Sequence, residues 1–510
     1  MHIDVLNEKI LDLDSLANVI QKLKDEGKKI ALCHGCFDLL HLGHLRHFKE
    51  AKSQGDILVV TLTEDRYINK GPDRPFFSQE QRAEYLASLE CIDFVSINRW
   101  ETAVETIEYL KPDIYAKGKE YKKAKNDITE NILREVQAVQ SIGGEIYYTD
   151  DITFSSSNLI NRSIGCISQE AKDFLSQLKK KYNFSSIRSL FDRLKSLNVL
   201  VIGDIILDEY HYTRPVGMPN KAANISLKYL KSELHPGGIL AIANHIAPFV
   251  NNVELFTVLG ADGYKQFISS SMKKNINLHL YERKDAPTVR KTRFINGWKK
   301  TRLFEVAFIE ESMIEKDLEM QILRDAAEKI NRADLVVLAD FGHYFISRDI
   351  IHFLENNSKF LTINVQTNSL NYGFNTISKV NKADYISIDE RELRMRFQNN
   401  IHSCQELMAK LFQSTKVDKL AITSGDKGSR IANRKNESTT VPTFTNNAVD
   451  TVGAGDAYLA LSSLIASQSD DLELIGFLGT VAGGIATKYL GNESSLDKQS
   501  VCNYINTLLK

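Results

Sequence analysis

The sequence predicts an α/β protein whose two domains follow one another along the chain. Its 510 residues are more than three times a typical domain of about 150 residues, and two large α/β domains fit this length better than three small ones. Short apolar runs alternate with helical segments over residues 1–160, and this alternation starts again at residue 197. The charged stretch between these two regions has the sequence period of a helix. We therefore expect domains at 1–163 and 196–510, joined by a helical linker at 164–195.

The composition is that of an ordinary globular protein. Hydrophobic residues make up 43% and charged residues 25%, which excludes a collagen-like or largely disordered chain. The net charge of −1 provides no global basic field, so we expect no nucleic-acid partner and only local anion sites. No apolar run approaches the ~20 residues of a membrane span, and the six cysteines follow no disulfide spacing. We expect a cytoplasmic protein that does not bind membranes.

The first domain begins with an amphipathic helix over 14–27, which Asp14 or Ser15 can cap and Gly27 can end. A strand, a glycine-containing turn, a helix and a second strand then form a β-loop-α-β unit at 29–65. Further strands are expected at 94–97, 113–116 and 145–148. This order predicts a parallel sheet of about five strands.

Two histidines stand three residues apart where a helix starts behind the first strand. The amides of that helix start favour phosphate oxygens, and His41 and His44 lie on one face of its first turn. Their imidazoles could donate to a triphosphate and stabilise the charge that grows as pyrophosphate leaves. Gly43 lets the nucleotide approach where a side chain would block it.

The run from Gly35 to His44, G-x-F-D-x-x-H-x-G-H, resembles the cytidylyltransferase-like nucleotidyltransferases. Further segments resemble their heptose-1-phosphate adenylyltransferase branch, namely KGPDRP from Lys70, QR at 81–82, KG at 117–118 and SSSN at 155–158. The resemblance implies a Rossmann-like domain with four catalytic residues, His41, His44, Lys70 and Lys117, and with Arg74 on the substrate. The nucleotide-binding residues that it implies are Gly35, Cys36, Phe37, Gly43, Arg82, Ser155, Ser156 and Ser157.

Other interpretations of these residues stay open. Without the surrounding pattern, the lysines and arginines would read as solvated surface charges. Cys33 and Cys36 superficially suggest zinc or a redox pair, but no second pair accompanies them, so we expect neither. We expect His34 and His47 to pack or to lie at the surface.

The second chemical site is the turn DTVGAGD at 450–456. Gly453 and Gly455 free consecutive amides to form an anion nest, and the helix that follows adds its N-terminal dipole. Asp456 is placed to take a proton from a hydroxyl that attacks the γ-phosphate of ATP. This heptad resembles the signature of the ribokinase-like (PfkB) sugar kinases, and the resemblance extends over most of 197–496.

The resemblance implies a doubly wound α/β kinase domain, and its heptose-7-phosphate kinase branch fits best. The implied residues are Asp208, Gly237 and Gly238 for the substrate, Thr423, Gly425, Gly428, Gly453, Ala454 and Gly455 for the nucleotide, and Asp389 and Glu392 for Mg²⁺. Two departures concern the site. Ala241 stands where the family has an Asn that contacts the sugar, and Asp389 replaces the Asn of N-x-x-E.

A kinase makes a phosphomonoester and a nucleotidyltransferase consumes one. The two halves therefore predict a bifunctional enzyme that makes a nucleotide-activated sugar, resembling the ADP-heptose synthases with reversed domain order. ATP as the nucleotide follows from the heptose resemblance and CTP from the wider superfamily, with Mg²⁺ as cofactor and a homodimer as assembly. The alternative is a sugar- or polyol-phosphate nucleotidyltransferase whose kinase-like domain is degenerate and serves binding or dimerisation, which Ala241 and the unusual segment 364–375 motivate.

Overall fold

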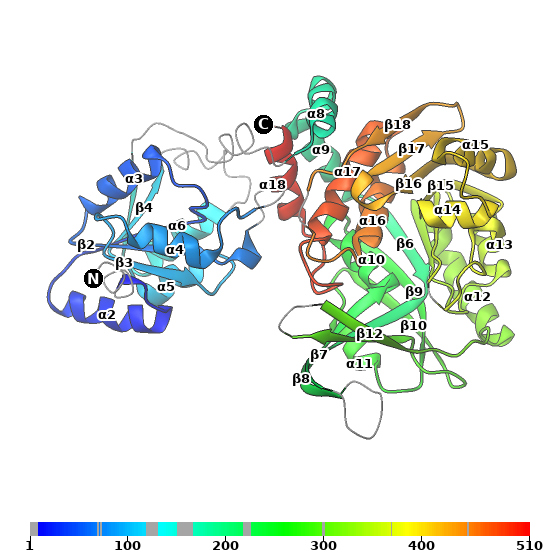
Figure 1. Cartoon of the computed structure of the whole chain (residues 1–510), viewed down its shortest axis with the longest axis horizontal. Coiled ribbons are helices and arrows are strands. Elements are labelled where there is room, and N and C mark those ends of the chain that lie inside the picture. The colour runs from blue at the N-terminus through cyan, green and yellow to red at the C-terminus, as the bar shows by residue number, and fades with distance from the viewer. Residues whose placement is uncertain are drawn as a thin grey trace. The chain divides into compact units, whose positions relative to one another are not determined.

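The chain folds into two compact units, an N-terminal unit (Met1–Ile167 with Cys502–Lys510) and a C-terminal unit (Ser168–Val501) (Figure 1). The computed structural model describes residues 9–68, 71, 74–118, 131–149, 167–217, 226–297, 301–368, 370–445 and 448–509. Within these ranges, no helix combines the length and the apolar character needed to cross a bilayer.

The N-terminal unit contains a parallel sheet in the order β3-β2-β1-β4-β5. Its strands are β1 (Ile30–Gly35), β2 (Ile57–Thr63), β3 (Phe94–Asn98), β4 (Ile114–Gly118) and β5 (Glu145–Thr149). Its helices are α2 (Leu13–Asp25), α3 (Leu42–Lys52), α4 (Gln79–Ala87), α5 (Val104–Leu110) and α6 (Asn131–Ser141), with the 3₁₀ turn η1 (Asp65–Tyr67). Along β1, Ala31 and Cys33 enter one core cluster and Ile30 and Leu32 the other, so both faces of the sheet are covered.

The start of α2 differs from the prediction. Asp12 is the N-cap, and its Oδ1 accepts the backbone N–H groups of Asp14 (3.0 Å) and Ser15 (2.9 Å). The expectation of a cap at Asp14 or Ser15 was therefore wrong, because both residues already belong to the first turn. Gly27 follows the helix at φ +79°, in the left-handed region that glycine favours.

The C-terminal unit is built on a nine-stranded sheet in the order β10-β9-β6-β13-β14-β15-β16-β17-β18. It is parallel from β10 to β16 and antiparallel over its last two strands. These strands are β6 (Asn198–Gly203), β9 (Asn252–Gly260), β10 (Ile276–Arg283), β13 (Leu335–Asp340), β14 (Leu361–Val365), β15 (Lys382–Asp389), β16 (Lys416–Thr423), β17 (Ser429–Asn433) and β18 (Ser438–Val441). The apolar run that begins this half was expected as one strand over 197–210, but only its first part is β6, and residues from 205 onward belong to a second sheet.

Helices enclose the large sheet on both faces. They are α8 (Gln169–Lys181), α9 (Phe184–Leu194), α10 (Ile239–Ile246), α11 (Lys265–Ser270), α12 (Lys316–Arg332), α13 (Arg348–Asn357), α14 (Glu390–Phe397), α15 (Cys404–Ser414), α16 (Ala454–Ala466) and α17 (Leu472–Ala486), with the 3₁₀ turns η4 (Ala247–Phe249), η5 (Ile377–Lys379) and η6 (Gly425–Lys427). The last helix, α18 (Lys498–Leu509), contains the boundary between the two units.

A second sheet of four strands, in the order β12-β11-β7-β8, was not predicted. Its strands are β7 (Ile205–Gly217), β8 (Ser226–Gly238), β11 (Arg290–Asn296) and β12 (Thr301–Phe308). β7 continues almost directly from β6 of the large sheet, and β8 leads back into α10. The small sheet is therefore anchored at the carboxyl end of β6, where ligands of open α/β sheets bind.

The segment expected as a helical linker forms α8 and α9, and both are counted with the C-terminal unit. α9 buries one apolar face, and its Phe191 ring meets Phe249 of η4 at a centroid distance of 5.3 Å. The predicted domain limits themselves stay predictions.

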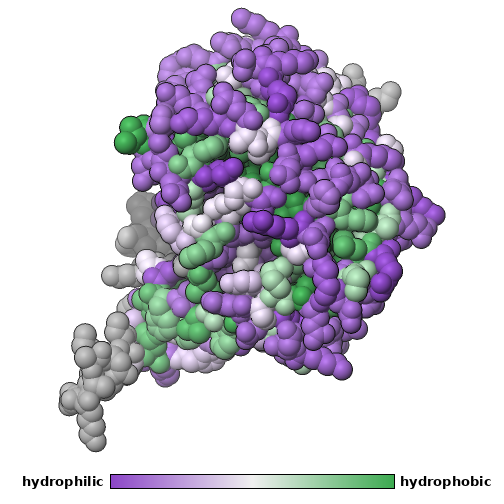
Figure 2. Space-filling view, turned by 90° about the vertical axis from the view of Figure 1, so that its right-hand side faces the viewer, coloured by the Kyte–Doolittle hydropathy of each residue, from purple (hydrophilic) through white to green (hydrophobic). Residues whose placement is uncertain are grey.

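Figure 2 shows one face of the molecule, which is largely hydrophilic with small, separate apolar groups.

Candidate active sites

The first site lies where the chain reverses its direction of winding in the N-terminal sheet. β1 has β2 on one side and β4 on the other, and Cys33 pairs with Ala116 in register. The loop after β1 and Lys117 at the end of β4 therefore meet at one carboxyl edge. In open parallel sheets this switch point is where ligands bind.

The loop after β1 is held in one conformation by Phe37, which lies in the left-handed region at φ +47°. Its ring covers Gly35 so closely that a Cβ there would lie 2.9 Å from the ring. The same ring meets His44 and Phe48 edge-on at centroid distances of 5.7 and 5.1 Å. A side chain at position 35 would therefore force the Phe37 ring to move.

His41 and His44 stack on each other with ring centroids 4.0 Å apart and planes 21° from parallel. His41 caps α3, and its Nδ1 accepts the N–H groups of Gly43 (3.1 Å) and His44 (3.4 Å). In return, Nδ1 of His44 accepts the His41 N–H at 3.4 Å. A neutral imidazole that accepts at Nδ1 carries its proton on Nε2. Both rings can therefore donate through Nε2, as charge stabilisation at a phosphate requires.

Arg82 is buried and makes four internal contacts. Its guanidinium donates to the carbonyl oxygens of Phe77 (3.1 Å), Cys36 (2.5 Å) and Thr63 (2.8 Å) and pairs with Asp65 (2.5 Å). These acceptors lie directly after β1, at the end of β2, in η1 and just before α4. Stabilising these segments accounts for Arg82 better than the predicted contact with a nucleotide.

Arg74 is also buried, in an ion pair with Asp38 at 2.5 Å. Asp38 accepts two further N–H groups, from Phe76 (2.7 Å) and Phe77 (3.1 Å). This pair connects the β1 loop to the segment before α4. The Arg74 charge is balanced within the protein, so its predicted role at the substrate has no support from the contacts.

Lys117 forms an ion pair with Glu135 of α6 at 2.8 Å, and both side chains are largely buried. Nothing in the sequence pattern pointed to Glu135, because the pairing depends on how α6 packs beside β4. His34 and His47 bond to threonine hydroxyls, Thr61 at 2.9 Å and Thr149 at 2.8 Å. Four predicted site residues, Lys70, Ser155, Ser156 and Ser157, lie outside the described residues.

The second site is the turn that opens α16 in the C-terminal unit. Gly453 is the N-cap residue at φ +81°, and a Cβ added at Gly455 would meet nothing within 4 Å. Asp450 holds the turn, since its carboxylate accepts the N–H groups of Val452 (3.1 Å) and Gly491 (2.9 Å). Arg302 of β12 pairs with the same carboxylate at 2.5 Å. The small sheet is thereby fastened to the glycine turn, where Ala454 starts the helix.

Asp456 lies buried in the first turn of α16. Burial, followed by the nearby charge of Asp208, raises its pKa to about 7, although a hydrogen bond from Gln366 Nε2 (3.1 Å) acts in the opposite direction. A carboxylate with a pKa near neutrality is matched to general-base catalysis. The position and the electrostatics of Asp456 both suit proton removal from an acceptor hydroxyl.

Asp208 of β7 faces the same space and is held on both oxygens. Oδ1 pairs with Arg293 of β11, and Oδ2 accepts from Asn492 Nδ2 at 2.8 Å. A Cβ at Gly237 would overlap this carboxylate, and Gly238 adopts φ +57°. The glycine pair thus lets β8 pass close to Asp208. No motif indicated Arg293 or Asn492 as partners of Asp208.

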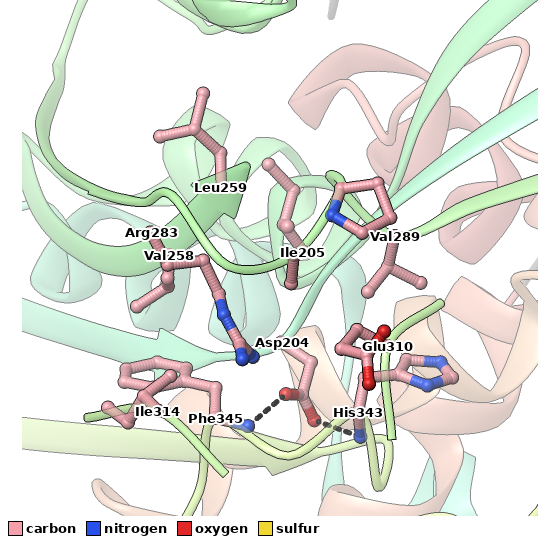
Figure 3. A pocket seen from close by; sticks show the side chains of 12 residues that line it. Asp204, Ile205, Val258, Leu259, Arg283, Val289, Glu310, Ile314, His343 and Phe345 are labelled. Atoms are coloured by element: carbon pink, nitrogen blue, oxygen red, sulfur yellow. Dashed lines mark hydrogen bonds between the residues drawn. The ribbon is translucent and has the colours of Figure 1, made fainter. Parts of the chain in front are cut away.

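Asp204, at the end of β6, shapes the turn behind β13. Figure 3 shows its carboxylate accepting the N–H groups of His343 and Phe345, both at 3.3 Å, and Phe341 N–H donates at 2.8 Å. Burial and the neighbouring Asp340 raise the pKa of Asp204 to about 7. Asp204 and His343 line a cavity together with Arg283.

The predicted nucleotide side lies at the end of β16. Thr423 is its last residue, and η6 starts at Gly425, which has φ +57°. Gly428 has φ +83°, and a Cβ there would overlap the carbonyl oxygen of Val441. Gly428 is therefore required by the approach of β18. The binding of a nucleotide by these residues stays a prediction, because the contacts among the described residues do not test it.

Asp389 and Glu392 form a capping box at the start of α14 rather than an open ligand pair. Asp389 accepts the Arg391 N–H at 2.8 Å, while Glu392 accepts the N–H groups of Asp389 (2.7 Å) and Thr367 (3.0 Å). Burial raises the pKa of Glu392 to about 8. The described residues contain no cluster of three or more His, Cys, Asp or Glu side chains that could hold a metal.

Comparison with known proteins identifies a family model for each half of the chain. Residues 32–163 match the cytidylyltransferase-like family model, and residues 196–499 match the model of the pfkB family of carbohydrate kinases. The N-terminal part is 38% identical over 168 residues to the bifunctional protein HldE of Geobacter metallireducens, which covers 32% of each chain. It is 37% identical over 165 residues to HldE of Geobacter sulfurreducens, again 32% of each. The chain thus spans about a third of the length of these curated relatives.

Among solved structures, phosphofructokinase-2 from Escherichia coli in complex with potassium has a TM-score of 0.51 at 15% identity. The match covers 61% of this chain and 99% of that chain, and it supports the fold. The predicted fold class, Rossmann-like followed by ribokinase-like, is confirmed. The chain belongs to the pfkB family of carbohydrate kinases and has a cytidylyltransferase-like domain in front of the kinase domain.

Proposed function

We propose that the chain is a bifunctional enzyme that makes a nucleotide-activated sugar. Its kinase half phosphorylates a heptose-phosphate-like sugar, and its transferase half joins a sugar 1-phosphate to the NMP of ATP or CTP and releases pyrophosphate. The observation that carries the proposal is that one chain holds two separate groups of side chains whose geometry suits catalysis. These are the stacked His41 and His44 at a sheet switch point and the buried Asp456 behind a glycine turn.

In the kinase reaction, Asp456 accepts the proton of the acceptor hydroxyl as its oxygen attacks the γ-phosphorus of ATP. The bond from that phosphorus to the bridging oxygen breaks, and ADP leaves. The amides of 453–455 and the start of α16 face the charge on the phosphoryl oxygens. Asp208 holds sugar hydroxyls once one of its oxygens exchanges an internal partner for the substrate.

In the transferase reaction, an oxygen of the sugar phosphate attacks the α-phosphorus of the nucleoside triphosphate in line. The pyrophosphate leaves with both electrons of the broken bond. His41 and His44 donate through Nε2 to phosphoryl oxygens, because their Nδ1 atoms are occupied by the start of α3. Lys117 adds a positive charge at the same sheet edge, shared with Glu135, and Lys70 is proposed as a second cation.

The family resemblance implies Mg²⁺, and the donor set of the kinase half is compatible with it. Asp389 and Glu392 use some lone pairs for backbone N–H groups, but each carboxylate oxygen has more than one. Magnesium bound to nucleotides keeps several waters and needs only one or two carboxylates. When bound, it neutralises phosphate charge. Asp389 and Glu392 would hold it through that hydration shell.

A second candidate function is a nucleotidyltransferase whose kinase-like half does not turn over. Asp208 is occupied by Arg293 and Asn492, and Ala241 replaces the expected sugar-binding Asn. The intact glycine turn and the placement of Asp456 favour an active kinase. We further propose a cytoplasmic homodimer that acts on small molecules and not on nucleic acid.

The test separates the two activities by their products. Purified full-length protein is given a panel of sugar and polyol phosphates with ATP or CTP, and pyrophosphate and ADP are measured in parallel. His44→Ala should lower pyrophosphate release by about 10²–10³-fold and leave ADP formation unchanged. Asp456→Ala should do the reverse. His47→Ala, one turn further along α3, is the matched control.

Each outcome bears on the proposal. If His44→Ala keeps the full rate of pyrophosphate release, the transferase assignment is wrong. If wild type and Asp456→Ala form ADP alike, the second candidate replaces the bifunctional enzyme. The nucleotide that supports turnover decides between ATP and CTP.

A further inference from the structure

Gln366 is the first residue after β14, and its half-buried side chain contacts the proposed catalytic base directly. Its Nε2 donates a hydrogen bond to Oδ1 of Asp456 at 3.1 Å. An ionised carboxylate only accepts hydrogen bonds, so the amide must present its nitrogen here. In the part of the chain that the structure describes, no donor contacts the other oxygen, Oδ2. One oxygen of Asp456 is therefore held, and the other is left for a substrate.

The direction of the Asp456 carboxylate needs such a contact. The last torsion of an aspartate side chain has broad minima, so packing alone does not fix the plane of the carboxylate. Asp208 and Glu392 repel its ionised form, whereas Lys291 attracts it. These charges act through space and do not select one oxygen. The hydrogen bond from Gln366 selects Oδ1, and it also lowers the pKa of the carboxyl against the burial that raises it.

The backbone of Gln366 is fixed on both sides. Its N–H donates to the carbonyl oxygen of Asp340 at 2.8 Å, and its own carbonyl oxygen accepts from Asn375 Nδ2 at 3.0 Å. Asn375 is buried, and its amide oxygen accepts from Lys379 Nζ at 2.6 Å. Ordering a glutamine side chain costs rotamer entropy. A backbone that is already held leaves only the side chain to be ordered.

The next residue, Thr367, connects the same segment to the start of α14. Its N–H donates to Glu392 Oε1 at 3.0 Å, and its hydroxyl donates to the carbonyl oxygen of Asn375 at 2.7 Å. Two successive residues thus contact the proposed base and a proposed Mg²⁺ ligand. This arrangement argues against the degenerate kinase half that the unusual segment 364–375 motivated.

We propose that Gln366 is a positioning residue of the kinase half, which holds Oδ1 of Asp456 so that Oδ2 faces the acceptor hydroxyl. This inference rests on the proposed kinase function and adds a residue that belongs to neither signature motif. The proton of the hydroxyl passes to Oδ2, while the amide of Gln366 keeps its own protons. Gln366 acts on the reaction only through Asp456.

The experiment measures ADP formation by the full-length protein as a function of pH, with ATP and the acceptor that gives most ADP in the sugar panel. Gln366→Met removes the donor and should lower kcat about tenfold, the worth of one hydrogen bond to a charged group, with both KM values changed little. The rise of kcat/KM with pH should move to higher pH. The reason is that the lost hydrogen bond favoured the ionised carboxylate.

Two further variants separate positioning from a merely structural role. Gln366→Lys supplies a charged donor, so it should recover most of kcat and move the rise of kcat/KM to lower pH. Asn364→Leu is the matched control from the same segment. Asn364 Nδ2 donates to the carbonyl oxygen of Ser387 at 2.7 Å, and the side chain has no hydrogen bond to Asp456. This variant should lower the melting temperature but leave kcat and the pH profile as in wild type.

Two results would overturn the inference. One is an unchanged kcat and pH profile in Gln366→Met. The other is a loss of kcat with an unchanged pH profile that Gln366→Lys does not recover, which would leave Gln366 a structural role only.

A second measurement does not depend on kinase activity. If wild type forms no ADP with any acceptor, the proposed kinase function fails on its own. Urea unfolding of Gln366→Met, Asp456→Ala and the double variant then tests the contact. Non-additive effects on stability would support it, and additive effects would refute it. The same cycle decides the inference if Gln366→Met is too unstable for the kinetic assay, with Gln366→Lys in its place.

Discussion

Replacing Asp456 by Asn should make the protein more stable while removing kinase activity. Burial and Asp208 raise the pKa of this carboxyl from 3.8 to about 7. Between these two pH values the folded state holds a proton that the unfolded state has lost, so stability falls as the pH rises. Above pH 7, the ionised carboxylate costs the folded state up to about 4 kcal/mol, at 1.36 kcal/mol for each pKa unit. Asparagine keeps the shape and does not ionise.

The assay is urea unfolding of the full-length protein at pH 5 and pH 8. Asp456→Asn should gain more stability over wild type at pH 8 than at pH 5, and ADP formation should fall by about 10²–10⁴-fold. In wild type, kcat/KM should rise with pH through an apparent pKa of about 7. Asp317→Asn, at an exposed position of α12, is the control.

Two results would refute the reasoning on Asp456. A stability difference that is the same at both pH values would show that burial does not penalise the charged carboxylate. Retention of kinase activity in Asp456→Asn would show that another group takes the proton. Because stability and activity are expected to move in opposite directions, simple misfolding of the variant cannot imitate the predicted result.

Two further predictions concern residues with structural roles. Arg74→Met leaves the Asp38 carboxylate buried without its cation, so we expect the free energy of unfolding to fall by about 3–5 kcal/mol. Urea unfolding followed by Trp100 fluorescence, in a Trp298→Phe background, measures this loss. An unchanged unfolding midpoint would contradict the prediction. Gly428→Ala puts a Cβ onto a backbone carbonyl, whereas Gly425→Ala meets no atom within 4 Å. Gly428→Ala should have a clearly lower melting temperature than Gly425→Ala, whose left-handed backbone costs only ~1–2 kcal/mol. Equal melting temperatures of the two variants would contradict this prediction.

The sequence predicted the large sheets well because their strands are buried on both faces and read as apolar runs. The small sheet was not predicted, and β12 shows why: its sequence TRLFEVAF is rich in apolar residues, but most of them are exposed, so the run does not mark a buried strand. Its key pairing joins β7 to β11, which are about eighty residues apart in the chain. A contact of this separation depends on the tertiary fold, and it is the contact that brings Arg293 to Asp208.

The candidate sites were predicted in part, for a related reason. A motif identifies residues that face a common point, as with His41 and His44 or Asp456 and the glycine turn. A motif does not show what else a long side chain reaches. Arg82 fits a phosphate-binding pattern, yet its guanidinium donates to backbone carbonyl groups far away in the sequence. The spacing of residues around Arg82 does not indicate these contacts.

The capping contact of His41 couples the start of α3 to the tautomer of a side chain that we propose as catalytic. The Gly43 amide is bonded to His41 Nδ1 only when the ring is seated with its proton on Nε2. Hydrogen–deuterium exchange at Gly43 is therefore expected to report the tautomer of His41 without any substrate. Acidification that protonates Nδ1 removes this acceptor and should deprotect the Gly43 amide while more distant amides of α3 stay slow. One backbone proton would thus record whether His41 holds the tautomer that the proposed triphosphate site requires.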